Sequence, residues 1–268
     1  MKTRPEIKTL AKEAMGAQRG TAILLTFTFA LMSFVSGWLD NMVERATGGQ
    51  GTAYWIVFIA GMFILWVMMV NMLGEYIKLY KREYASAGEI FTGLGVNFWR
   101  KLGGMAWMTL WLTLWSIPIV VTYTLGWSPV LALLFTIPVI VMSMAYFFTP
   151  NILADCPSVK ATQALKICMR ITKGHRGAIF IFVLSFFGWF ILTGLPAAVL
   201  AFGGPGGFIL GALASAAIYL LYVGPYFWTA DAGFYLELRD KALRDGVVTH
   251  EELGIPAPVV PHEPMIIN

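Results

Sequence analysis

The longest uncharged run in the chain, between Arg176 and Asp231, constrains the fold more than any other feature. Its 54 residues contain no Asp, Glu, Lys, Arg or His. One helix that crosses a hydrocarbon layer of about 30 Å needs about 20 residues, so the run is long enough for two crossings and a turn. Backbone polar groups inside such a layer must be bonded within their own segment, which favours helices. The run therefore predicts a transmembrane helical hairpin.

Two further segments have the same design. Lys101 and Asp155 enclose 53 residues without a charge or a histidine, and Arg19 and Glu75 enclose 55 residues. Each segment begins after a cation and ends before a carboxylate. Three such units predict an internal threefold repeat with six transmembrane helices, which is an all-α integral membrane architecture. The predicted repeats cover about residues 3–84, 86–155 and 157–244. The first is interrupted in its middle by Asp40, Glu44 and Arg45, and a loop is expected there from Asp40 to about Thr52.

Composition supports the membrane assignment. The chain is 58% hydrophobic and 13% charged, whereas a soluble globular domain carries about 25% charged residues. Of its 19 Lys and Arg residues, 18 lie before the first predicted helix, after the sixth, or in the connections between the predicted hairpins; Arg45 is the exception. The positive-inside rule therefore predicts that both termini are cytoplasmic. The charges are scattered along the membrane borders, which argues against nucleic-acid binding.

An amphipathic helix in the membrane interface is expected before each hairpin, over about residues 3–19, 86–102 and 157–173. The third is the clearest, with Asp155 as its expected cap and one polar stripe formed by Lys160, Gln163, Lys166, Arg170 and Lys173. After Arg244, residues 246–268 are expected to form a Pro-rich cytoplasmic tail. Thr249 can cap one helical turn there, and the prolines from Pro256 onward prevent further helix.

Several short motifs carry a resemblance to a known family. They are Ala154-Asp155-Cys156-Pro157, Lys173-Gly174, Leu184-Ser185-Phe186-Phe187-Gly188-Trp189 with Ile191-Leu192, and Pro225-Tyr226 followed by Phe234-Tyr235 and Leu238. Over about residues 150–240 the chain resembles the bacterial membrane family called domain of unknown function 975. It departs from that pattern at Cys168, Thr172 and Thr229. The resemblance implies a polytopic protein of the bacterial inner membrane, and it brings no established activity, so no catalytic residue is carried over.

The charges that border the uncharged runs form the main candidate site. Packing of the three hairpins around one axis would bring them together at the cytoplasmic mouth, where a charge ring could gate a cavity or hold a cationic headgroup. The alternative is that these charges only mark where the hydrocarbon layer ends. The ring would consist of Glu75, Asp155 and Asp231 at the exits and Arg19, Lys101 and Arg176 at the entrances.

Small residues indicate a second kind of site, for helix packing. Gly207, Gly211 and Ser215 recur every four residues, a spacing that permits close helix approach. Gly188 is expected to serve the same purpose. The stripe suits packing within the monomer or a seam between two copies. The first helix of the third hairpin is expected to end before Pro196, and the glycine-rich segment 203–207 is expected to form the loop.

The sequence carries no catalytic motif, metal-ligand spacing or cofactor motif, so we expect a protein that is not an enzyme. The leading hypothesis is a non-catalytic binder or transporter of a hydrophobic or amphipathic molecule, such as a lipid or a peptide. The alternative is a scaffold or assembly subunit of a membrane complex. The expected partners are membrane lipids and either further copies of the chain or another membrane protein.

Overall fold

The computed structural model describes residues 2–256, and within that range the chain is helical with no β-strand. Five helical stretches are long and apolar enough to cross a membrane. This confirms the predicted all-helical class with helices suited to crossing a membrane. The five stretches are Arg19–Thr47, Thr52–Tyr80, Phe98–Thr124, Pro129–Asp155 and Arg176–Arg244.

The first hairpin follows a short amphipathic helix, α1 (Arg4–Ala17), and consists of α2 (Arg19–Thr47) and α3 (Thr52–Tyr80). The loop expected from Asp40 to about Thr52 is wrong, because α2 continues to Thr47. Gly48 ends it with a φ of +72°, a left-handed conformation that glycine adopts readily. The longer helix keeps the backbone N–H and C=O groups hydrogen-bonded, and Asp40, Glu44 and Arg45 do not interrupt it.

The second hairpin consists of α5 (Phe98–Thr124) and α6 (Pro129–Tyr146), followed by the short α7 (Thr149–Asp155). The amphipathic helix expected over 86–102 is wrong. Only one helical turn, α4 (Glu89–Thr92), forms before α5 begins at Phe98, and Asn97 between them has a positive φ of +54°. The segment's several glycines each disfavour helix by up to about 1 kcal/mol relative to alanine, which explains the irregular path.

The third hairpin lies within the longest apolar stretch. It follows α8 (Ala161–Thr172), and its rising arm comprises α9 (Arg176–Leu184) and α10 (Phe187–Leu200). The chain reverses at Ala201–Gly203 and returns as α11 (Gly204–Ile218). A π-helical turn then leads into α12, after which one short helix follows. These last elements are Tyr219–Val223, α12 (Gly224–Arg244) and α13 (His250–Leu253).

The loop of the third hairpin is therefore not the glycine-rich segment 203–207 but the shorter turn at Ala201–Gly203. Gly204 already begins α11, with Pro205 in its first turn, where a missing backbone N–H does no harm. The predicted end of the rising helix before Pro196 is also wrong, since α10 includes Pro196 and continues to Leu200.

The small residues on α11 contact α10 of the same hairpin. A Cβ atom at Gly211 would lie 2.5 Å from the carbonyl oxygen of Pro196 and 2.8 Å from Cα of Ala197. The Ser215 hydroxyl accepts a hydrogen bond of 3.2 Å from the backbone N–H of Ala197. The prediction that Gly188 also permits close helix packing is wrong. A Cβ there would meet nothing within 4 Å, so Gly188 makes no close helix contact.

Gly211→Ala is expected to destabilise the third hairpin by about 1–3 kcal/mol, because the new methyl group overlaps backbone atoms that cannot rotate away. Thermal unfolding of the detergent-solubilised protein measures the effect. The matched control is Gly188→Ala, also within a helix of this hairpin, where open space leaves only the helix-propensity gain of alanine. Equal melting temperatures for the two variants would contradict the contact.

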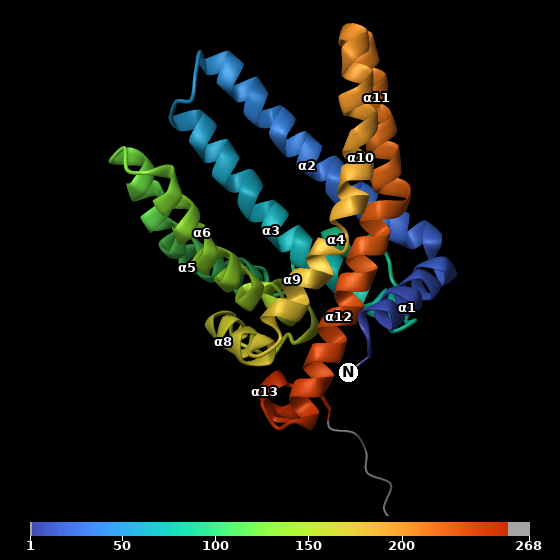
Figure 1. Cartoon of the computed structure of the whole chain (residues 1–268). Coiled ribbons are helices and arrows are strands. Elements are labelled where there is room, and N and C mark those ends of the chain that lie inside the picture. The colour runs from blue at the N-terminus through green and yellow to red at the C-terminus, as the bar shows by residue number, and fades with distance from the viewer. Residues whose placement is uncertain (1, 257–268) are drawn as a thin grey trace, which may run out of the picture.

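Figure 1 shows that the three hairpins diverge toward their loops and converge at the opposite end, where α1, α8 and α13 lie. We call these ends the tips and the base. Aromatic side chains form the core of the base: the rings of Phe182 and Phe234 stack with centroids 4.6 Å apart, and those of Phe148 and Phe234 lie 6.0 Å apart. The diverging hairpins expose many large apolar side chains, as expected for contact with lipid.

The amphipathic helices at the base bury their apolar faces against protein. Helix α1 packs on α12 and α3 through Ile7, Ala11 and Ala14, and Lys8 Nζ lies 4.3 Å from the ring centroid of Phe186. Helix α8 exposes the whole predicted polar stripe and buries its opposite face. Asp155 is not its cap, because the residue before α8 is Lys160 and Asp155 ends α7.

The described part of the expected tail packs against the base. Val248 and Leu253 are buried, and Arg170 of α8 forms an ion pair with Glu252. The predicted turn at Thr249 is confirmed, since its hydroxyl accepts a hydrogen bond of 3.1 Å from the backbone N–H of Glu252. The remaining prolines of the predicted tail, Pro258, Pro261 and Pro264, lie outside the described residues.

Candidate functional site

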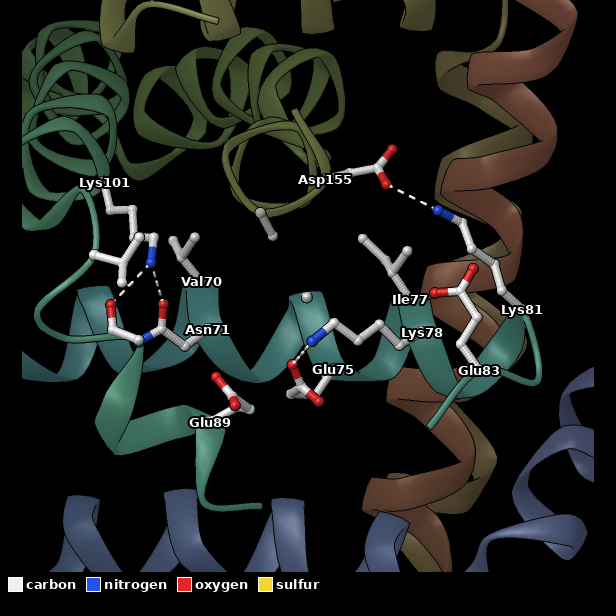
Figure 2. A pocket seen from close by; sticks show the side chains of 14 residues that line it. Val70, Asn71, Glu75, Ile77, Lys78, Lys81, Glu83, Glu89, Lys101 and Asp155 are labelled. Atoms are coloured by element: carbon white, nitrogen blue, oxygen red, sulfur yellow. Dashed lines mark hydrogen bonds and ion pairs between the residues drawn. The ribbon is translucent and has the colours of Figure 1, made fainter. Parts of the chain in front are cut away.

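Three of the six residues of the predicted charge ring line one pocket at the base. Glu75 of α3, Lys101 of α5 and Asp155 of α7 surround a cavity of about 340 Å³, shown in Figure 2. Its wall also contains four further charged residues: Lys78, Lys81, Glu83 and Glu89. The other three ring members, Arg19, Arg176 and Asp231, do not line this pocket.

Lys101 is buried and bonded to neutral oxygens. Its Nζ donates to Oδ1 of Asn71 at 2.6 Å and to the carbonyl oxygen of Gly93 at 3.0 Å. Asn71 in turn donates to the carbonyl of Ile90 at 3.0 Å. Lys101 thus holds the irregular 88–97 segment against α3 and is not paired with Asp155.

Glu75 connects its own helix to the loop that follows. One carboxylate oxygen lies 2.6 Å from Nζ of Lys78, and the other accepts from the backbone N–H of Ser86 at 2.9 Å. Lys78 follows Glu75 by three residues, so the pair lies on one helix face. The acid therefore satisfies a backbone group in the segment between α3 and α4.

Asp155 joins three helices. Its Oδ1 lies 3.1 Å from Nζ of Lys81, the residue that follows α3. Its Oδ2 accepts from the Tyr235 hydroxyl at 3.0 Å and from Arg239 at 2.5 Å, both on α12. The side chain is 6% exposed. Neighbouring Arg100 donates to the carbonyls of Leu153 and Val159, so the end of α7 is tied to α5 as well.

The members of the predicted ring do not form ion pairs with one another. Among residues 2–256, Arg19, Lys101 and Arg176 form no ion pair with Glu75, Asp155 or Asp231. Arg19 is exposed and Arg176 is half-buried. The pairing cations are instead Lys78, Lys81 and Arg239. The spacing of Lys78 from Glu75 indicates that pair from the sequence, whereas nothing local links Arg239 to an acid 84 residues earlier.

Asp231 lies in a second, mainly apolar pocket of about 470 Å³. The acid is 2% exposed. Its Oδ2 accepts from the side-chain amide of Asn151 at 2.9 Å, and its Oδ1 has no hydrogen-bond partner among the described residues. The pocket is walled by α3, α5, α6, α7 and α12, where the hairpins converge. Sequence analysis identified Asp231 but not the pocket or Asn151.

The two cysteines supply neither a reactive thiol nor a metal site. Both are free and buried. Burial raises the pKa of the Cys156 thiol to about 11 and that of Cys168 to about 12, so both stay protonated near neutral pH. Across the described part of the chain, no group of three or more His, Cys, Asp or Glu residues is placed to hold a metal ion.

Comparison with known proteins gives one match. The family model described as "Protein of unknown function (DUF975)" matches residues 125–242, which confirms the resemblance inferred from the motifs. No curated protein and no solved structure matches the chain. The matched segment contains about half of the residues that line the apolar pocket, Asn151 and Asp231 among them, but only Ala154 and Asp155 of those that line the polar pocket.

Proposed function

We propose that this chain, which matches the DUF975 family over residues 125–242, is a non-catalytic binder or transporter of an amphipathic molecule. The observation that carries the proposal is the apolar pocket of about 470 Å³ at the junction of the hairpins. Its volume lies within the range of about 300–1,000 Å³ that is usual for small-molecule sites. A lipid or a hydrophobic peptide segment is the class of ligand that such walls favour.

The proposed setting is the bacterial cytoplasmic membrane, crossed six times by three hairpins that arose as repeats. In support, the longest apolar stretch reverses at Ala201–Gly203, and α10 packs along α11, so that stretch supplies two crossings. The base carries α1, α8 and α13 with most of the basic residues, which favours a cytoplasmic base and cytoplasmic termini. Reporter fusions at both termini test this orientation, and a periplasmic terminus would refute it.

Native mass spectrometry of the protein released from lipid nanodiscs tests the binding function. We expect the wild type to retain a defined lipid or small molecule. Ser143→Trp, which fills the pocket from α6, should lose it. Leu133→Trp is the matched control, because Leu133 lies on the same helix and is 70% exposed outside the pocket.

Two results would overturn the proposal. Retention of the same molecule by the Ser143→Trp variant would place binding elsewhere. A protein that arrives with no small molecule and with a stoichiometric protein partner would favour the alternative, a scaffold subunit of a membrane complex.

A further inference from the structure

The apolar pocket contains a buried acid that lacks a countercharge. Asp231 is 2% exposed, and the polar side chain that contacts it is the neutral amide of Asn151. Oδ1 has no partner among the described residues, and no Lys, Arg or His lines the pocket. A carboxylate removed from water is costly unless a cation or several donors compensate it. The free oxygen therefore indicates a missing positively charged or hydrogen-bond-donating partner.

The rest of the wall suits an organic cation. Trp66 of α3, Tyr146 of α6, and Phe227 and Trp228 of α12 line the pocket. Aromatic faces attract cations, and this attraction is used in the recognition of quaternary ammonium groups. Met69, Met105 and Met108 add polarizable thioethers that adapt to irregular ligands.

The same wall is unsuited to an inorganic ion. Ca²⁺ takes six to eight oxygen ligands, and Mg²⁺ retains several waters in an octahedral shell. Polar side chains are few in this pocket, and one of them, Ser143, donates its hydroxyl to the carbonyl of Val139 on its own helix. An ion that keeps a water shell would face mostly apolar side chains. A cation that carries its own apolar groups meets no such penalty.

We propose that this pocket binds a hydrophobic cation, such as an amphipathic amine or quaternary ammonium, with its charge at Asp231 and its apolar groups against the aromatic wall. This inference rests on the proposed binding function and names its ligand class. Asn151 is assigned as a positioning residue that holds the carboxylate through the 2.9 Å hydrogen bond. A buried acid is a natural centre for such selectivity, because salt screens its interactions with a bound charge much less than those of an exposed group.

The test uses two probes of matched shape and opposite charge, tetraphenylphosphonium and tetraphenylborate. Equilibrium dialysis against the full chain in phosphatidylcholine nanodiscs measures each, with protein-free nanodiscs subtracted. We expect saturable phosphonium binding that is at least tenfold tighter than borate binding. Asp231→Asn keeps the shape and removes the charge, and it should weaken phosphonium binding at least tenfold.

The control is Asp245→Asn, the same chemical change at an exposed residue just after α12. It should leave the phosphonium affinity within about twofold. If Asp231→Asn does not fold, two other measurements test the inference. One is the charge selectivity of the wild type, and the other is phosphonium binding by the variant Trp66→Leu, which should be severalfold weaker. Equal affinity for both probes, or full phosphonium affinity in Asp231→Asn, would overturn the inference.

Together, the two experiments distinguish a failure of this inference from a failure of the proposed binding function. A protein that retains a lipid in native mass spectrometry but shows no charge-selective phosphonium binding overturns the cation class and leaves the binding function supported. A protein that retains nothing and binds neither probe overturns both.

Discussion

Asp155→Asn is expected to lower the free energy of unfolding by about 3 kcal/mol or more, a typical cost of breaking a buried ion pair from one side. The loss arises because Arg239, whose side chain is 12% exposed, keeps its charge while its buried counter-ion disappears. Lys81 and the Tyr235 hydroxyl lose the same partner. Reversible unfolding in mixed detergent micelles, followed by circular dichroism, measures the change.

Asp240→Asn is the matched control for that result. Asp240 also pairs with Arg239, at 2.7 Å, but its side chain is 47% exposed. Exposed pairs contribute about 1 kcal/mol or less, so this variant should be close to the wild type. Similar losses in the two variants would mean that burial does not distinguish the two acids, and the three-helix connection through Asp155 would lose its support.

Phe234→Ala is expected to cost about 3–5 kcal/mol, the usual range for a large side chain removed from a packed core. Phe234 is fully buried between the rings of Phe148 and Phe182, which belong to the second and third hairpins. The deletion therefore leaves a cavity at the point where hairpins converge. The same unfolding measurement detects the loss of stability, and limited proteolysis should show faster cleavage at the base.

Phe202→Ala provides the control for the core deletion. Phe202 lies in the turn between α10 and α11 and is 95% exposed. Its removal should change the free energy of unfolding by less than about 0.5 kcal/mol, as for surface substitutions generally. A Phe234 variant as stable as this control would show that the aromatic cluster at the base contributes little to holding the hairpins together.

The positions of the apolar helices could be predicted because they depend on local properties. The uncharged runs after Arg19, Lys101 and Arg176 set where helices can lie in hydrocarbon. Errors occurred where a local signal was weak. Before α5, the helix expected over 86–102 is reduced to the single turn α4. Most of the loop expected after Asp40 is helical, since charges near a membrane border are compatible with both states.

The candidate sites could be predicted only in part. Glu75, Lys101 and Asp155 were identified by their places at the ends of apolar runs, and they do line one pocket. Their partners could not be identified in the same way. A charge at the end of one helix has several possible neighbours, and the tilt of the hairpins decides which is near.

By itself, the sequence determined the membrane class, the helical hairpins and the amphipathic faces of α1 and α8, because hydrophobic length and periodicity act within about 20 residues. Only the tertiary structure decided that Asp155 pairs with Arg239, 84 residues later, and that Asn151 contacts Asp231, 80 residues later. Such contacts depend on how separate helices pack, and side-chain packing is not encoded in any one segment. The apolar pocket between those helices is likewise a product of their packing.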